Sequence, residues 1–146
     1  MKKTFALLLA LVLARRTAVR IVAPLSAVGY VYVATSNQSA WYPLPEEGAE
    51  PYEVTVQQTD EDGNLYENIV CITPEGVYML RSNCDNQDCI DEGTVTLENK
   101  ATRILSNWIV CLPHQVIVEL YTAQEVLDMM LASIAESGAA SDNTAE

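Results

Sequence analysis

Alternation of apolar and polar positions dominates the middle of the chain and predicts short β-strands. From residue 52 to residue 57 every second side chain is apolar, as in a strand with one buried face, and the same period returns at residues 115–121. Further strand-like runs lie between these two, at residues 65–73, 77–81, 94–97, 101–105 and 108–112. Short strands separated by turn residues predict an all-β domain over residues 52–121, folded as a small β-barrel or a sandwich.

The pattern changes to a helical one after residue 121. Thr122 and Glu125 have the spacing of a capping box, in which each side chain binds a free amide of the first turn. Apolar residues then recur at positions 127, 130, 131 and 134, which predicts one C-terminal α-helix over residues 122–136. We expect its apolar stripe to pack on the β domain, the alternative being a partner-binding helix, and we expect a disordered tail at residues 137–146.

The N-terminus has the pattern of an export signal. Lys2 and Lys3 precede an apolar run at residues 4–14, which is too short to span a bilayer. Two interpretations remain open for residues 1–34 as a signal peptide or membrane anchor. Either the signal is cut after residue 14, or residues 21–34 are the inserted part. In both, the body is exported, outside the cell or anchored on the outer side of the membrane, and touches the membrane only through this segment.

Proline-rich and small polar residues follow this segment. Three prolines and no periodic apolar pattern occur at residues 35–51, so this stretch is predicted to be a linker.

Charge is distributed unevenly along the chain, and its acidic part is unsuited to nucleic acids. The chain has 20 acidic and 8 basic residues, a net charge of −12, and five of the basic residues lie within the first 20 positions. Nucleic-acid affinity comes largely from Lys and Arg that displace counterions from phosphates. A body with this acidity predicts no nucleic-acid binding.

Four cysteines offer the main candidate chemistry. Cys71, Cys84, Cys89 and Cys111 form an even set in a chain that we expect to be exported, where thiols tend to be oxidised, so all four are disulfide candidates. Cys84 and Cys89 could close a small loop. Cys71 and Cys111 could face each other from strands, and a pairing of Cys84 or Cys89 with Cys111 is equally compatible.

A metal site is the alternative for the same residues. Cys84, Cys89, Cys111 and His114 together offer three sulfurs and an imidazole, which is a sensible ligand set for zinc. Only the Cys111 and His114 pair has the two-residue gap that places two ligands on one turn. The leading expectation is therefore that the chain carries no cofactor and no metal.

Two of the segments described above resemble a known family. The stretch from Val77 through Cys84 and Cys89 to Gly93, with the later run from Trp108 to Leu120, resembles NusG domain II over roughly residues 52–121. The resemblance implies a small all-β, barrel-like domain, often found as a stand-alone exported or membrane-anchored protein. The family is named after transcription factors in which the domain is inserted, and this chain has no room for their polymerase-binding and KOW domains. Asp85 stands where the family commonly has proline.

Catalysis is not indicated by the sequence. The chain contains one histidine, no Gly-rich phosphate loop, and no pair of cysteines at the two-residue spacing of thioredoxin-type redox motifs. We therefore predict a non-catalytic extracytoplasmic binding or structural module with a possible protein partner in the cell envelope. The alternative is a thiol-disulfide or zinc-binding module that uses the cysteines and His114.

Overall fold

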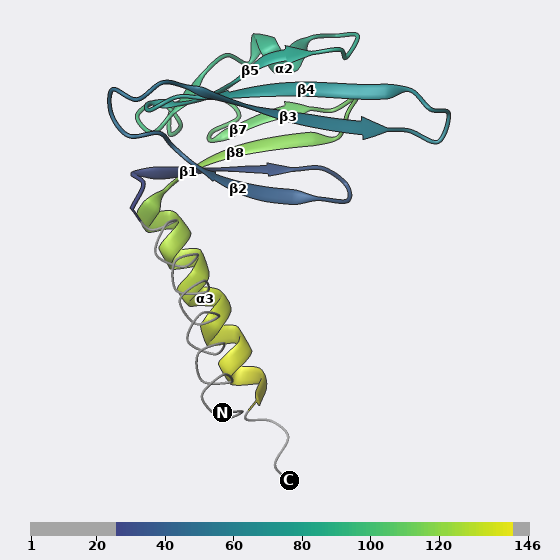
Figure 1. The fold of residues 1–146 in the computed structure, drawn as a ribbon. Helices are drawn as coiled ribbons and strands as arrows, with labels where there is room; N and C mark the ends of the chain where they lie inside the picture. Colours follow the sequence, from purple (N-terminus) through teal and green to yellow (C-terminus); the bar gives the residue numbers. More distant parts are fainter. Residues whose placement is uncertain (1–25, 142–146) are drawn as a thin grey trace, which may run out of the picture.

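Two four-stranded antiparallel sheets face each other in the computed structural model, which describes residues 26–141 (Figure 1). Sheet A has the order β2 (Ser39–Pro43), β1 (Gly29–Ala34), β8 (Val116–Thr122) and β7 (Trp108–Cys111). Sheet B has the order β3 (Tyr52–Thr59), β4 (Leu65–Ile72), β5 (Gly76–Ser82) and β6 (Val95–Thr96). The predicted all-β class is confirmed. The described strands do not close into a barrel, so the sandwich is the correct form.

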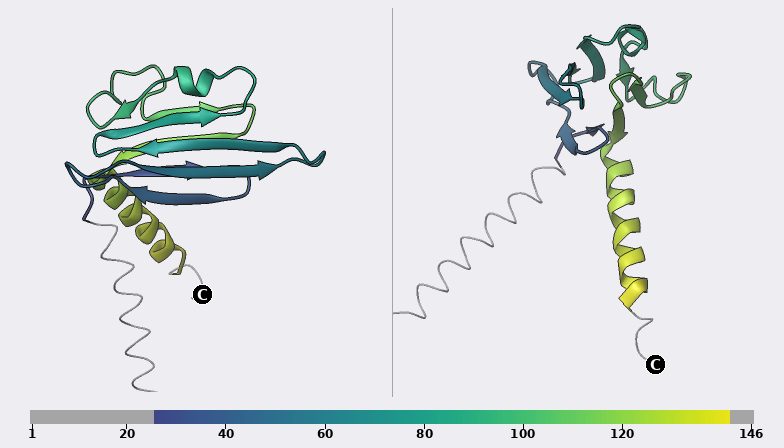
Figure 2. Two further views of the ribbon diagram at one scale, coloured as in Figure 1. Left: turned by 45° about the horizontal axis from the view of Figure 1, so that its top comes forward. Right: turned by 90° about the vertical axis from the view of Figure 1, so that its right-hand side faces the viewer.

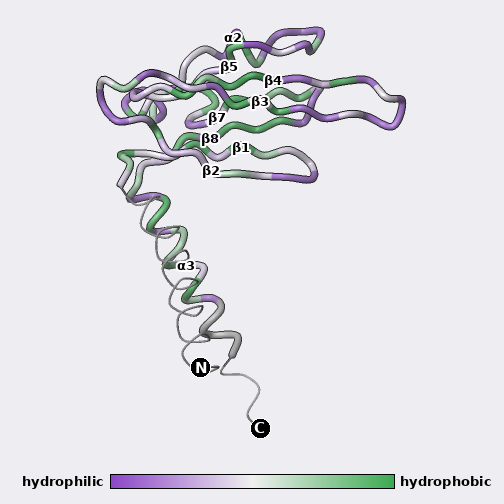
Figure 3. Tube along the Cα trace, viewed as in Figure 1, coloured by the Kyte–Doolittle hydropathy of each residue, from purple (hydrophilic) through white to green (hydrophobic). Residues whose placement is uncertain are grey.

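The core lies between the two sheets and follows from the period-two pattern. Alternate residues of β8, namely Val116, Val118 and Leu120, are fully buried, and they meet the buried side chains of β4 and β5 in one cluster. Figure 3 shows the apolar residues concentrated along the strands and the hydrophilic ones at the loops that join them. One continuous apolar core therefore holds the sheets together.

The folded body begins earlier than the sequence pattern predicts. Gly29–Ala34, expected to belong to the signal or anchor, is β1, which pairs with β2 on one side and β8 on the other. Val31 of this strand is fully buried. A strand at the centre of sheet A cannot also be a membrane-inserted segment, so the interpretation with residues 21–34 inserted is wrong. The first 25 residues of the segment 1–34, predicted as a signal peptide or membrane anchor, lie outside the described residues.

The predicted linker also needs correction. Residues 39–43 form the edge strand β2, paired in register with β1, and Leu44 is buried in the core with only 3% of its surface exposed. Proline is tolerated here because Pro43 ends an edge strand, where one face of the backbone needs no partner. The domain therefore extends from β1 rather than from residue 52.

One predicted strand is absent from the described part of the chain. Residues 101–105 form turns between β6 and β7, and Ile104 is fully exposed. Side-chain and backbone bonds within the loop replace strand pairing: the Arg103 guanidinium donates to the backbone oxygens of Ser106 and Trp108 at 2.8 and 3.0 Å. The apolar residues that suggested a strand here do not face the core.

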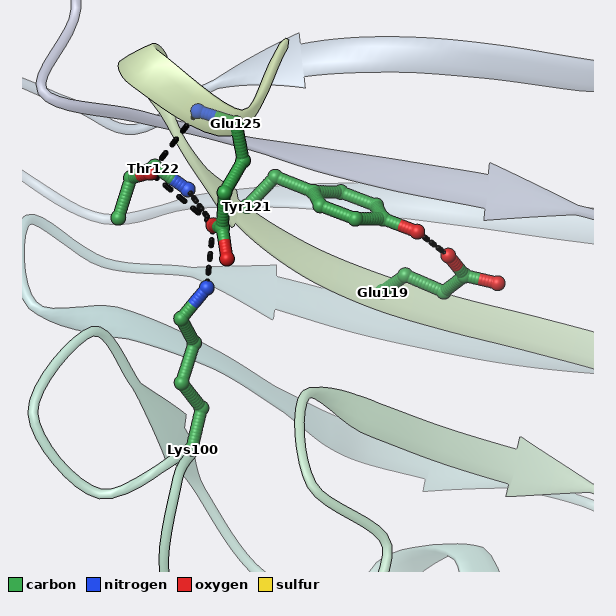
Figure 4. Close-up of polar contacts among 5 residues, drawn as sticks. All are labelled: Lys100, Glu119, Tyr121, Thr122 and Glu125. Carbon is green, nitrogen blue, oxygen red and sulfur yellow. Dashed lines mark hydrogen bonds and ion pairs between the residues drawn. The ribbon is translucent and has the colours of Figure 1, made fainter. Parts of the chain in front are cut away.

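The C-terminal helix α3 (Ala123–Ser141) begins at the predicted capping box (Figure 4). The Thr122 amide donates to the Glu125 carboxylate at 2.7 Å, and the Glu125 amide donates to Thr122 Oγ1 at 3.1 Å. Lys100 forms an ion pair with the same carboxylate. The helix continues through residues 137–141, which were expected to belong to a disordered tail.

The apolar stripe of α3 does not pack on the sheets as expected. Figures 1 and 2 show the helix leading away from the sandwich, with only its start against the strands. Val126 in the first turn is buried, whereas the stripe residues Leu127, Met130, Leu131 and Ile134 are 37%, 45%, 56% and 65% exposed.

Among residues 26–141, no helix combines the length and the apolar character needed to cross a membrane.

Candidate functional site

Three of the four cysteines meet at one buried point of the fold. Cys84 and Cys89 come from the loop after β5, Cys89 lying in the four-residue helix α2 (Asp88–Asp91), and Cys111 ends β7 in the other sheet. Their sulfur atoms all lie within 4.8 Å of one another, and those of Cys84 and Cys89 are 3.7 Å apart. All three side chains are at most 5% exposed. We call this group the sulfur cluster.

The loop that carries the first two sulfurs is held by hydrogen bonds between side chains and the backbone. Gln87 has a left-handed backbone conformation with φ of 57°, and its side chain donates to the Ser82 carbonyl oxygen at 2.9 Å. Farther along, the Glu92 carboxylate accepts the Val110 amide at 2.8 Å, which ties the end of the loop to β7. These contacts place α2 directly beside the strand that supplies Cys111.

A buried polar chain runs from the sulfur cluster into sheet B. Ser82 Oγ lies 3.7 Å from Cys111 Sγ, and it accepts bonds from the Cys84 amide at 3.2 Å and from Asn68 Nδ2 at 3.1 Å. Asn68 Oδ1 is 2.7 Å from His114 Nδ1. Asn68 is fully buried and His114 is 4% exposed. No buried side-chain nitrogen or oxygen among the described residues lacks a hydrogen-bond partner, which is what a buried polar group requires.

His114 is separated from the sulfurs by this chain. A carboxamide oxygen can only accept, so Nδ1 carries the proton and donates it to Asn68. The ring stacks on Tyr66, with centroids 4.6 Å apart and an angle of 11° between planes. Burial lowers the pKa of His114, against a smaller opposing effect of Asp85. The structure thus brings together three of the four proposed zinc ligands. His114 contacts Asn68 instead, which in turn donates to Ser82 beside the sulfurs.

The thiols of Cys84 and Cys89 differ in acidity. Burial opposes ionisation of Cys84, but hydrogen bonds from Ser82, the Gln87 backbone and the other two thiols outweigh it and lower its pKa. Burial raises the pKa of Cys89 to about 12, with further increases from Cys111 and Cys84. Of these two thiols, Cys84 therefore ionises first.

Cys71 lies apart from the cluster. It follows Val70 and precedes Ile72, both of which face the core, so strand alternation directs Cys71 to the opposite face of sheet B. There it pairs across the sheet with Tyr78. The expectation that Cys71 and Cys111 could face each other is not met, because their side chains lie on different faces of different sheets.

Two residues of the site were not predicted from the sequence. Ser82 and Asn68 stand in ordinary strand positions, and their role depends on pairing between β4 and β5, where they lie opposite each other. A polar residue at a position where the strand pattern requires an apolar one is the signal that could have identified Asn68.

Comparison with known proteins gives one family and several similar solved structures. The family model for NusG domain II matches residues 4–124. A DUF1312 family protein from Enterococcus faecalis is 16% identical, with a TM-score of 0.47 over 64% of this chain and 97% of its own. The solution structure of the Lin0431 protein from Listeria innocua is 18% identical, with a TM-score of 0.49 over 66% of this chain and 75% of its own. No curated protein matches the chain.

Proposed function

Because this chain belongs to the NusG domain II family, we propose that it is a non-catalytic module outside the cytoplasm, organised around a sulfur site made of Cys84, Cys89 and Cys111. The observation that carries the proposal is the convergence of these three sulfurs, within 4.8 Å and out of contact with solvent. Neither the family nor the DUF1312 neighbours attach an activity to the domain.

Two features support the location outside the cytoplasm. The basic start and apolar run of residues 2–14 have the pattern of an export signal, and all 20 acidic residues lie after position 45. The folded body begins after this run, so removal or membrane insertion of residues 1–25 would leave every described strand intact.

The absence of catalysis is supported by the way the reactive groups are used. The sulfur cluster has at most 5% exposure, so a substrate would find no accessible nucleophile there, and His114 is itself buried, with its Nδ1–H donated to Asn68. Buried cysteines of this kind act on structure rather than on substrates.

The site joins the loop after β5 to strand β7 of the other sheet. Cys84 and Cys89 lie in the loop between β5 and β6 of sheet B, whereas Cys111 belongs to sheet A. A chemical link among the three fixes that loop across the sandwich, so the state of the sulfurs controls how firmly the loop is held.

Paired substitutions test whether the three cysteines form one site. The free energy of unfolding is measured for Cys84→Ala, Cys111→Ala and the double variant, with the Cys71→Ala and Cys111→Ala pair as the matched control. We expect Cys84 and Cys111 to be coupled by about 1 kcal/mol or more, and Cys71 and Cys111 to be additive within about 0.5 kcal/mol. Additivity in both pairs would contradict the proposal.

A second candidate function rests on α3. Its exposed stripe of Leu127, Met130, Leu131 and Ile134 has the spacing of helices that insert into an apolar groove of a partner. Asp128 lies near the edge of the stripe, and the helix contains three acidic residues and no Lys or Arg. This charge favours a protein with a basic rim over an anionic lipid surface. We propose a protein of the cell envelope as the occupant.

Crosslinking from defined positions of α3 tests this second function. A photoreactive residue at position 131 is expected to give a crosslink to one envelope protein that disappears in the Ile134→Glu variant. The same probe at position 132, on the other side of the helix, is the control and should give none. Crosslinks only to lipid or to a second copy of the chain would contradict the proposal.

A further inference from the structure

Ser82 completes the sulfur cluster into a group of four potential ligand atoms. Its Oγ lies 3.7 Å from Cys111 Sγ, and the sulfurs of Cys84 and Cys89 are 3.7 Å apart. All three sulfurs lie within 4.8 Å of one another. Three sulfurs and one oxygen are thus gathered at one buried point, and four is the number of ligand atoms that a tetrahedral ion binds.

Two of the sulfurs have the spacing of ligands that share one metal ion. In a tetrahedral zinc site with Zn–S bonds of about 2.3 Å, neighbouring sulfurs are about 3.8 Å apart. The distance between Cys84 Sγ and Cys89 Sγ is 3.7 Å. We propose that the group binds one Zn²⁺ ion through the sulfurs of Cys84, Cys89 and Cys111 and the Oγ of Ser82. This inference rests on the proposed sulfur site and names its ligand.

The number of sulfurs favours a metal over a disulfide. A bond between Cys84 and Cys89 would leave Cys111 as a buried thiol against it, whereas a tetrahedral ion uses all three sulfurs at once. Thiolate ligands select soft or borderline ions such as Zn²⁺ over Mg²⁺ or Ca²⁺. The burial of the cluster is also typical of a closed structural zinc site.

Zn²⁺ binding requires only that the three thiols release their protons and that Ser82 Oγ exchanges one hydrogen bond for the ion. The three thiols lose their protons to water, and the ion takes a lone pair from each sulfur, so no oxidant or reductant is needed. A hydroxyl oxygen has two lone pairs. Ser82 therefore gives up its contact with the Cys84 amide, at 3.2 Å, and keeps the shorter bond from Asn68, at 3.1 Å, while its other lone pair binds the ion.

Asn68 and His114 form the outer support of this site. Asn68 Nδ2 fixes the orientation of Ser82 Oγ, and His114 Nδ1 fixes Asn68 from the other end at 2.7 Å. On the opposite side, Gln87 Nε2 lies 3.7 Å from Cys84 Sγ and donates to it. Partners of this kind commonly orient metal ligands and affect affinity by about 10 to 100-fold.

A zinc titration of the full chain tests the proposal. The reduced, chelator-treated protein is titrated with Zn²⁺ against a chromogenic chelator, and with Co²⁺ to record the absorption of a tetrahedral thiolate complex. We expect one ion per chain for the wild type and for Cys71→Ala, and loss of stoichiometric binding for Cys111→Ala. Ser82→Cys supplies a fourth sulfur at the same corner and is expected to bind Zn²⁺ about tenfold more tightly or better.

Three outcomes would overturn the proposal or the part of Ser82 in it and leave the sulfur site standing, and a fourth would contradict the site as well. Failure of the reduced wild type to bind Zn²⁺ contradicts the metal. An affinity of Ser82→Cys no higher than the wild type contradicts the role of Ser82. Absence of metal together with intact coupling of Cys84 and Cys111, and a mass lower by about two units, identifies a disulfide and leaves the sulfur site standing. Additive effects of Cys84→Ala and Cys111→Ala would instead remove the site itself.

Discussion

Replacement of Asn68 by alanine provides a sensitive test of the polar chain beneath the sulfur cluster. The carboxamide is fully buried, accepts from His114 Nδ1 at 2.7 Å, and donates to Ser82 Oγ at 3.1 Å. In Asn68→Ala the His114 donor loses its partner, which costs about 1–3 kcal/mol for a buried group. Ser82 keeps the Cys84 amide as a donor, so its loss is smaller.

The total expected destabilisation is about 2–4 kcal/mol, because the removed atoms also leave a small void. For a domain of this size such a loss lowers the melting temperature by roughly 10 °C or more. Urea unfolding in the presence of reductant and chelator measures the free energy of the metal-free fold alone. Asn37→Ala, at an exposed residue of the β1–β2 turn, is the matched control and should change stability by less than about 0.5 kcal/mol.

Coupling to His114 identifies the cause of the loss. If the orphaned imidazole donor accounts for most of it, adding His114→Phe to Asn68→Ala costs less than the sum of the two single effects, by about 1 kcal/mol or more. The reasoning is refuted if Asn68→Ala is no more destabilising than Asn37→Ala, or if the two single effects simply add.

Two further predictions concern strand packing and the start of α3. Gly76→Ala is expected to destabilise the fold by about 3 kcal/mol in thermal or urea unfolding, because the new Cβ would lie 1.9 Å from the Val95 carbonyl oxygen; a loss under about 1 kcal/mol would contradict this close approach. Glu125→Gln is expected to cost about 0.5–1 kcal/mol at neutral pH, because it removes the ion pair with Lys100 and the negative charge at the start of the helix. Burial raises the pKa of Glu125, but bonds from Lys100 and Thr122 outweigh this and lower it overall, so its stabilisation is present above the usual carboxyl pKa and is lost as pH falls through the folded value. The wild type and Glu125→Gln should therefore converge in stability at acid pH, and a gap that persists there would be inconsistent with the assigned contacts.

Strands with alternation or with an apolar run bounded by turn residues were predictable from sequence. β3 and β8 carry the period of two, β4, β5 and β7 are short apolar runs, and all five occur where the sequence predicts them. β1 was missed because both of its faces are covered in part, so that its sequence resembles the apolar end of a leader. Local composition cannot distinguish a buried central strand from a membrane segment; pairing with β8 decides it.

For helix α3, the sequence predicts where the helix begins but not the direction in which it runs. Its start follows from Thr122 and Glu125, whose contact is local and therefore visible in the sequence. Its direction is not local. The stripe at Leu127 to Ile134 predicts an apolar surface, but the geometry of the junction with β8 leads that surface away from the sheets rather than onto them.

The sequence predicted that cysteines would form the candidate site, but not which residues would lie beside them. Sequence alone allowed Cys84 or Cys89 to meet Cys111, and the fold brings all three together. It also suggested His114 as a ligand, since the residue follows Cys111 closely. The turn after β7 instead directs the imidazole to Asn68, and Ser82 takes the place beside the sulfurs.

Peptide-mapped alkylation of the folded, exported chain tests most directly whether Cys84, Cys89 and Cys111 act as one site, whatever links them. We predict that all three resist a thiol reagent as a set in the native wild type. Cys111→Ala should expose Cys84 and Cys89 to rapid modification, while Cys71→Ala should leave them protected. Equal reactivity of Cys84 and Cys89 in these two variants would contradict the account.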